Sequence, residues 1–452
     1  MPSSSPRSIT IIGAGLAGAQ TAAALRAHGF TGRLTVLGAE GVPPYDRPPL
    51  SKELLTRTEP LWISDDLGVD LSVLADDVRL DDPATRLTVT RDGVATEVAS
   101  SDTVTSDAVV LACGAEPLVP PGWDAASVLH TYRDAEALRA AIGPGVRVVI
   151  VGAGWIGAEV AGVAAGAGAE VTVVEAGGTP LERQLGGRVG AHLVPWFAEA
   201  GVRLVTGAPV EKVADDGVRA AGGEYFGADL VLAAVGARPA SGWLRGSLPL
   251  DARGGLRVNR AGRFLGTAMP GDPAGRLHAE ALARVWAVGD IATRDHPVFG
   301  AVPGGHWSAA LHDPEPTARA MLGVDERPAD PEPVRARLGL TPLRTHAPYV
   351  FSRQLGHDLA LFGVPSPFEQ VVFRGDPTGG DRWAAFYVEH SMHRSQRVTD
   401  QGHHVARVRA VLLADSPREV GQVRKLVNRP DPLIVDLERI VDPAVRLRDA
   451  VF

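Results

Sequence analysis

The segment SITIIGAGLAGAQTAAALRA, residues 8–27, decides the fold of this chain. It begins with a continuous apolar, β-branched run, which predicts a strand buried on both faces in a parallel sheet. Gly13, Gly15 and Gly18 follow with the spacing G-x-G-x-x-G, and an alanine-rich stretch comes after them. That spacing predicts a tight turn into a helix whose first N–H groups face a phosphate.

The same pattern occurs a second time in VRVVIVGAGWIGAEVAGVAAGAG, residues 146–168, with Gly152, Gly154 and Gly157 in the equivalent places. A second pair of similar segments, DAVVLACGAEP and DLVLAAVGARP, lies at residues 107–117 and 229–239. Each copy has a predicted strand, a glycine turn, a helix and another strand. Two related nucleotide-binding units with parallel βαβ order are therefore predicted in tandem.

Each copy has the residues that one dinucleotide needs. The first glycine permits the turn, the second lets the backbone approach a pyrophosphate, and the third allows the helix to pack against the strand. Glu40 and Glu175 follow the second strand of their copies, where a carboxylate accepts hydrogen bonds from a ribose. Glu175 would repel a 2′-phosphate, which favours NADH over NADPH, although Arg183 and Arg188 lie nearby in sequence.

Composition excludes several other classes of protein. The chain has 452 residues, a formal net charge of −8 and a single cysteine, Cys113. One cysteine forms no intrachain disulfide, CxxC redox pair or cysteine metal cluster, so redox chemistry requires an organic cofactor. The negative charge argues against a nucleic-acid or membrane partner. No export signal or membrane span is predicted, because the apolar stretches contain the glycine turns or charged residues, and we expect a cytoplasmic protein.

The first unit contains an insertion with fixed charges. The glycine turns are 139 residues apart, whereas the second pair of similar segments is 122 residues apart, so the first unit has additional chain. GVPPYDRPPLSKELL, residues 41–55, is the natural candidate for it. Arg47 supplies positive charge suited to a pyrophosphate, and Lys52 adds an ammonium to the same segment. The alternative for both residues is a solvated surface cation.

The motifs resemble a known group of enzymes, the FAD-dependent pyridine-nucleotide oxidoreductases. Within that group the chain is similar to ferredoxin reductases of the putidaredoxin and rubredoxin reductase type, which serve cytochrome P450 and ring-hydroxylating oxygenases. The resemblance extends from Ser8 to Pro443. Its most specific part is PYDRPPLSKELL at residues 44–55, and its other parts are LACGAEP, Tyr132-Arg133-Asp134, GAGWIGAEV, LAAVGARP, VWAVGDIA, His306-Trp307 and PYVFSRQLGHDLALFG.

The resemblance implies an α/β fold like that of glutathione reductase. Two tandem Rossmann-like domains are expected, followed by an α+β C-terminal domain. The expected FAD-binding domain is discontinuous, residues 1–115 and 241–323. The NAD-binding domain is expected at 116–240 and the C-terminal domain at 334–452, after a linker rich in proline and charge.

The resemblance also implies the site residues. For FAD these are Gly13, Gly15, Ala17, Gly18, Glu40, Arg47, Lys52, Ala112, Gly114, Arg133, Gly289, Asp290, His306 and Trp307. For NAD they are Gly152, Gly154, Trp155, Ile156, Gly157, Glu159, Glu175 and Gly236.

Lys52 and Glu159 are the candidate catalytic pair, whose contact would change with the redox state of the flavin and gate the nicotinamide. The alternative is an ordinary structural ion pair. For Asp290 the alternative is turn chemistry, and for His306 and Trp307 it is simple burial.

The implied reaction passes electrons from NADH through FAD to a [2Fe–2S] ferredoxin. Gly305, Phe351 and Arg353 depart from the family pattern where flavin would meet the acceptor. Direct reduction of oxygen or a small molecule, as in an NADH oxidase, therefore stays open. So does a flavin-based redox sensor like the apoptosis-inducing flavoproteins.

The expected partner arrangement is a monomer or weak homodimer. Residues 391–430 carry eight basic and three acidic residues, either to steer an acidic ferredoxin or as a solvated face. His390, His393, His403 and His404 lack the spacing of metal ligands, and no metal site is predicted.

Overall fold

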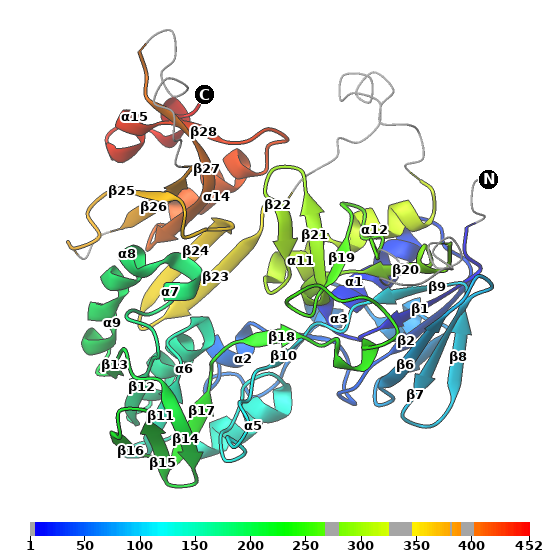
Figure 1. Ribbon diagram of the computed structural model, residues 1–452, viewed down its shortest axis with the longest axis horizontal. Helices are drawn as coiled ribbons and strands as arrows, with labels where there is room; N and C mark the ends of the chain where they lie inside the picture. The colour runs from blue at the N-terminus through cyan, green and yellow to red at the C-terminus, as the bar shows by residue number, and fades with distance from the viewer. Residues whose placement is uncertain (1–4, 267–279, 325–345, 380–381, 390–401) are drawn as a thin grey trace. The chain divides into compact units, whose positions relative to one another are not determined.

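The computed structural model describes residues 5–266, 280–324, 346–379, 382–389 and 402–452 (Figure 1). The chain divides into two compact units. Unit 1 comprises Met1–Asp46, Leu61–Glu116 and Arg238–His346, and unit 2 comprises Arg47–Pro60, Pro117–Ala237 and Ala347–Phe452. Residues 347–452 thus belong to the same compact unit as the second glycine turn. The predicted three-domain division stays a prediction, and residues 334–345 lie outside the described residues.

A five-stranded parallel sheet forms the centre of unit 1 (Figure 1). The first strand of the chain lies in the middle of this sheet. The order is β20 (Val285–Ala287), β9 (Ala108–Leu111), β1 (Ser8–Ile12), β2 (Arg33–Leu37) and β5 (Asp77–Arg79).

Different layers cover the two faces of this sheet. Successive strand residues point to opposite faces, so Ile9 and Ile11 of β1 pack in one buried cluster and Ile12 in another. The first cluster includes residues of α1 (Leu16–Ala27), α4 (Leu71–Leu74) and α12 (Pro314–Met321). The second includes residues of β6 (Ala84–Val89) and β7 (Val94–Val98), which form an antiparallel meander with β8 (Thr103–Ser106).

Smaller elements complete unit 1. They are the hairpin of β3 (Tyr45–Asp46) and β4 (Leu61–Trp62), the sheet of β19 (Leu256–Val258), β21 (Ala292–His296) and β22 (Gly300–Pro303), and the helical segments α3 (Ile63–Asp66), η2 (Gly242–Leu244), η3 (Gly289–Ile291) and α11 (Trp307–His312).

Unit 2 contains a second parallel sheet. Its order is β13 (Arg203–Val205), β12 (Glu170–Val174), β11 (Arg147–Val151) and β17 (Leu230–Ala233). Its other elements are α2 (Pro49–Lys52), α5 (Tyr132–Ala141), α6 (Trp155–Gly166), α7 (Glu182–Leu185), α8 (Gly187–Gly190), η1 (Ala191–Leu193), α9 (Val194–Glu199) and the meander β14 (Val210–Ala214), β15 (Gly217–Ala220) and β16 (Tyr225–Gly227).

An antiparallel sheet built from the last hundred residues also belongs to unit 2. Its first strand packs on α6, where a Cβ on Gly162 would lie 2.8 Å from the Leu355 nitrogen. The buried Arg374 donates to four carbonyl oxygens of residues 440–445 and fixes the end of the chain. The strands, in order, are β23 (Tyr349–Gln354), β24 (His357–Gly363), β27 (Val405–Ala414), β26 (Trp383–Val388) and β25 (Gln370–Arg374), with β28 (Ile434–Asp436) beside β27. The helical segments are α14 (Pro417–Val427), α15 (Leu437–Val441) and η5 (Leu447–Ala450).

The two glycine turns share one geometry. Gly13 has a φ of 114° and Gly152 a φ of 106°, values that favour glycine. A Cβ on Gly18 would lie 1.9 Å from the Gly13 carbonyl oxygen, and a Cβ on Gly157 would lie 2.1 Å from that of Gly152. The repeat predicted from the sequence is therefore present in the backbone of both units.

In the described ranges, no helix is long and apolar enough to cross a membrane.

Replacing Gly157 with alanine should destabilise unit 2. The new Cβ would meet backbone, which cannot move as a flexible side chain does, so we expect a loss of about 2 kcal/mol and a lower thermal midpoint by circular dichroism. Gly166→Ala is the matched control, because it lies in the same helix with no atom within 4 Å of its added Cβ. Equal melting of the two variants would contradict the close approach.

Candidate functional site

The carboxyl ends of three parallel strands meet at the first glycine turn in unit 1. Gly13 follows β1, and its added Cβ would lie 2.2 Å from the carbonyl oxygen of Ala112, which follows β9. Gly289 follows β20, and its added Cβ would lie 3.0 Å from the Cβ of Ala17 in α1. The structure thus brings together four residues that the sequence assigned to FAD. Ligands of open α/β sheets bind at such strand ends.

The second glycine of each turn faces open space. A Cβ on Gly15 would have no atom within 4 Å, and one on Gly154 would have only the Ala234 oxygen at 3.9 Å. These glycines are the N-caps of α1 and α6, and neither helix has a side-chain cap. Because the chain's own packing does not require glycine there, the turns fit the approach of an anionic group to the helix N–H groups.

Tyr45 and Asp46 of the insertion bind the side chains of two residues predicted for the FAD site, Glu40 and Trp307. The Tyr45 hydroxyl donates to Glu40 Oε2 at 2.6 Å. The Trp307 indole N–H donates to Asp46 Oδ1 at 2.8 Å. These two anchors were not predicted from the sequence, because only the charges of Arg47 and Lys52 were interpreted in this segment.

The departure at Gly305 has a local reason. Its φ is 102°, in the region that favours glycine. Its N–H donates to Asp290 Oδ1 at 2.9 Å. At Gly304, an added Cβ would lie 2.4 Å from the Asp290 Cα. A tight glycine loop therefore holds the Asp290 carboxylate.

Arg294 and Asp313 form a largely buried ion pair that the sequence did not predict. Asp313 Oδ2 lies 3.0 Å from Arg294 Nε, and the Arg294 and Asp313 side chains are 11% and 19% exposed. Burial raises the pKa of the Asp313 carboxyl, against the effect of Arg294.

His306 is a helix cap. Its Nδ1 accepts from the Ala309 N–H at 3.2 Å at the start of α11 and lies 2.9 Å from Ser308 Oγ. Burial lowers the pKa of His306 to about 4, so the ring is neutral near pH 7. Burial likewise raises the pKa of Cys113 to about 12, which keeps it a thiol.

Acidic side chains hold the loop after β12 in unit 2. Glu175 accepts from the Ala153 N–H at 2.6 Å and the Gly177 N–H at 2.7 Å. Glu182 accepts from the Gly178 N–H at 2.6 Å. Each carboxylate oxygen has a further lone pair, so Glu175 can still accept from a ribose. Of the two arginines nearby, Arg188 donates to the Val371 carbonyl.

Lys52 and Glu159 form an ion pair inside unit 2. Lys52 Nζ lies 2.9 Å from Glu159 Oε1, and their side chains are 17% and 3% exposed. The Ser51 and Ser352 hydroxyls, each at 2.5 Å, donate to Oε2 and Oε1 of the same carboxylate. Lys52 Nζ also lies over the Phe351 ring, 4.8 Å from its centroid. The contact between Lys52 and Glu159 that the resemblance implies is present, and Ser51 and Ser352 also bind the Glu159 carboxylate.

The remaining candidates are placed as follows. Arg47 donates to the His130 carbonyl in unit 2. Arg133 is exposed in the first turn of α5. Trp155 and Ile156 begin α6, and Ile156 is 44% exposed. Gly114 and Gly236 have φ values of 71° and 121°. Arg47, Lys52 and Arg133 thus belong to unit 2, whereas Gly13, Gly15, Gly18, Glu40, Asp290 and Trp307 belong to unit 1.

A family model described as pyridine nucleotide-disulphide oxidoreductase matches residues 7–312. The chain belongs to the pyridine nucleotide-disulphide oxidoreductase family.

Relatives of this family member cover almost its whole length. It is 30% identical to a probable ferredoxin reductase of Castellaniella defragrans, over 97% of both chains. It is also 30% identical to the ferredoxin–NAD(+) reductase subunit of the benzene 1,2-dioxygenase system of Pseudomonas putida, over 98% of this chain and 97% of that one. A chain of the covalent putidaredoxin reductase–putidaredoxin complex matches with a TM-score of 0.79 and 25% identity, over 98% of both chains. The predicted resemblance and fold class are confirmed.

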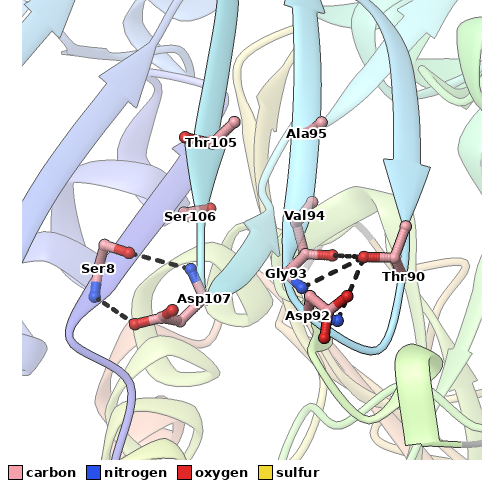
Figure 2. Close-up of a pocket in the computed structure, with 9 residues that line it drawn as sticks. All are labelled: Ser8, Thr90, Asp92, Gly93, Val94, Ala95, Thr105, Ser106 and Asp107. Carbon is pink, nitrogen blue, oxygen red and sulfur yellow. Dashed lines mark hydrogen bonds between the residues drawn. The ribbon is translucent and has the colours of Figure 1, made fainter.

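A pocket of about 340 Å³ lies at the other end of the unit 1 sheet, where β1 and β9 begin. Figure 2 shows the residues that line it. Hydrogen bonds within its lining join Ser8 to Asp107 and Thr90 to Gly93. None of the site residues predicted for this oxidoreductase lines it. Its lining residues are Ser8, Thr90, Asp92, Gly93, Val94, Ala95, Thr105, Ser106 and Asp107.

The basic C-terminal segment of this oxidoreductase is partly neutralised. Arg407 lies 3.4 Å from Glu389, and Arg409 lies 3.7 Å from Glu369. His403 pairs with Asp436 at 2.8 Å. His390, His393, Arg394 and Arg397 lie outside the described residues. The described residues contain no cluster of three or more side chains suited to a metal ion.

Stability should fall in mild acid because of His306. Its folded pKa of about 4 lies below the ordinary 6.5, so the unfolded chain binds the proton first. The stability that the neutral ring contributes is present above pH 6.5 and is lost toward pH 4, by about 3 kcal/mol. His306→Asn keeps a capping side chain but cannot titrate, and it should show a smaller drop in thermal midpoint between pH 7.5 and 5. An unchanged drop would contradict a neutral His306 in the folded protein.

Proposed function

We propose that this chain is an FAD-containing NADH:ferredoxin reductase that serves an oxygenase or cytochrome P450. The observation that carries the proposal is the pair of glycine turns, each with an open second glycine ahead of a helix that has no side-chain cap. Two such turns in one chain provide for two dinucleotides. The relatives over the full length are named as ferredoxin reductases, which supports ferredoxin as the acceptor.

The absence of a thiol relay supports direct electron transfer. Cys113 is the single cysteine of the sequence, and its raised pKa keeps it protonated and unreactive. Disulfide reduction needs a reactive thiolate, so an acceptor other than a disulfide fits this chain.

We assign the FAD site to the strand ends of unit 1. Gly15 and the first N–H groups of α1 would face the pyrophosphate, and Glu40, held by Tyr45, would accept from the adenosine ribose. Asp290 would hold the ribityl chain from its glycine loop. The other residues that we propose for FAD binding are Gly13, Ala17, Gly18, Ala112, Gly114, Gly289, His306, Trp307, Arg47 and Arg133. When bound, FAD would supply the chemistry that links NADH, a two-electron hydride donor, to one-electron acceptors, so that one NADH reduces two ferredoxin molecules and one proton is released.

We assign NADH to the second turn. Gly154 and the start of α6 would face its pyrophosphate, and Glu175 would accept from the ribose while repelling a 2′-phosphate. The other proposed contacts are Gly152, Trp155, Ile156, Gly157 and Gly236. Lys52 and Glu159 are the proposed catalytic pair, because the ammonium would stabilise negative charge on the reduced ring.

We propose that the protein works in the cytoplasm. A single cysteine cannot form an intrachain disulfide, which fits a reducing compartment. A monomer or weak homodimer stays our expectation.

The reductase assignment predicts flavin bleaching followed by ferredoxin-dependent turnover. Anaerobic mixing of the yellow holoprotein with NADH should bleach the visible flavin band in a stopped-flow spectrometer. Addition of a [2Fe–2S] ferredoxin should then raise steady-state NADH consumption by at least tenfold over the rate with oxygen alone. Bleaching without stimulation by ferredoxin would favour the oxidase alternative, and an unbleached flavoprotein would contradict hydride entry.

Glu175→Ala should weaken NADH binding by about tenfold and NADPH binding far less, because it removes both the ribose acceptor and the charge that repels a 2′-phosphate. The dependence of the flavin bleaching rate on NADH and on NADPH concentration, followed in the stopped-flow spectrometer, would measure both constants. Glu170→Ala, an exposed residue at the opposite end of the same strand, is the matched control. An unchanged preference in Glu175→Ala would show that the ribose lies elsewhere.

A further inference from the structure

We infer that Ser51 and Ser352 are positioning residues for Lys52, acting through Glu159. The two serines share the Glu159 carboxylate with Lys52 and so weaken the attraction between Glu159 and the Lys52 ammonium. The ammonium can then interact with a second anion, the reduced flavin of the proposed function. The inference deepens the role of Lys52 and rests on the proposed function for its relevance to flavin. The network itself lies within unit 2 and is tested independently.

Three segments that are distant in sequence meet at one buried carboxylate. Glu159 comes from α6, Ser51 and Lys52 from α2, and Ser352 from β23. Glu159 is 3% exposed, so its charge must be satisfied by these neighbours. Oε1 is shared by Lys52 and Ser352, and Oε2 is bound by Ser51.

The orientation of the Ser352 hydroxyl is fixed by Gln354. The Gln354 Nε2 donates to Ser352 Oγ at 3.0 Å. The hydroxyl therefore accepts from Gln354, and its single proton goes to Glu159. Both Ser352 and Gln354 are buried, at 3% and 1% exposure, so water does not compete freely for either group.

Neutral hydrogen-bond donors to a carboxylate reduce its electrostatic attraction for a cation. Each hydrogen bond draws electron density toward its donor, so a carboxylate with two hydroxyl donors attracts an ammonium less strongly than a bare one. The cation also has a second partner, the Phe351 ring at 4.8 Å. Lys52 thus interacts both with the Glu159 carboxylate, whose attraction is weakened by the two serines, and with the face of the Phe351 ring.

Two arginines on the elements packed against α2 have partners elsewhere. Arg139 of α5 donates to the carbonyls of Leu54 and Arg57. Arg353 of β23 lies 3.8 Å from Asp358 and is exposed. The pair of Lys52 and Glu159 is therefore the interaction that the two serines can tune.

The chain offers a clean measurement because it has three lysines, Lys52, Lys212 and Lys425. Lys212 and Lys425 are exposed and serve as internal references. Trace acetylation of the oxidised holoenzyme at one pH, read by mass spectrometry of peptides, gives the labelling of Lys52 relative to these two. In Ser352→Ala, Glu159 should hold Lys52 more tightly, and the relative labelling should fall about two- to tenfold.

Ser51→Ala is the second variant, since it frees the other oxygen and should shift labelling in the same direction. Ser416→Ala is the matched control, because it removes a buried hydroxyl of unit 2 that donates to the Ala414 carbonyl instead. Glu159→Gln should raise the labelling of Lys52, which shows that the assay senses the carboxylate. Unchanged or increased labelling in folded Ser352→Ala or Ser51→Ala would overturn the inference.

A second measurement separates this inference from the proposed function. The midpoint potential of the bound flavin should become more negative in Ser352→Ala, because less of the Lys52 charge is available to the reduced ring. Lower labelling with an unchanged potential would support the serine network and contradict the role of Lys52 toward flavin. Lys52→Met, which removes the ammonium, gives the largest potential shift expected.

Discussion

The structure depends on one close approach that occurs twice, between the third glycine of a turn and the carbonyl oxygen of the first. An added Cβ would lie 1.9 Å from that oxygen at Gly18 and 2.1 Å from it at Gly157, far closer than two non-bonded atoms can approach. This contact lets a helix start directly above the end of its strand. The helix N–H groups then point to the strand ends, where Gly15 and Gly154 leave open space.

The segment from Tyr45 to Lys52 serves both compact units. Its first two residues belong to unit 1, where Tyr45 holds Glu40 and Asp46 holds Trp307. Its later residues belong to unit 2, where Ser51 and Lys52 bind Glu159. Nearly every polar side chain in this stretch forms a hydrogen bond or ion pair with another residue. These contacts restrict which residues can occupy the segment.

The departures from the family pattern have local physical causes. Gly305 adopts a backbone conformation that favours glycine and donates to Asp290. Phe351 supplies an aromatic face for the Lys52 ammonium. Arg353 is exposed beside Asp358. The departures therefore leave both dinucleotide turns and the Lys52–Glu159 pair in place.

The sequence by itself determined the two parallel units and their glycine turns, because strand burial, glycine spacing and helix starts are local properties of a few consecutive residues. It also identified Lys52 and Glu159, but only through resemblance. The tertiary structure alone decided that Ser51 and Ser352 bind Glu159 and that Gln354 orients Ser352. It also decided that Tyr45 and Asp46 act as anchors and that His306 caps α11. Such contacts join residues that are distant in the chain, and hydroxyl or amide side chains leave no periodic pattern that would reveal their partners.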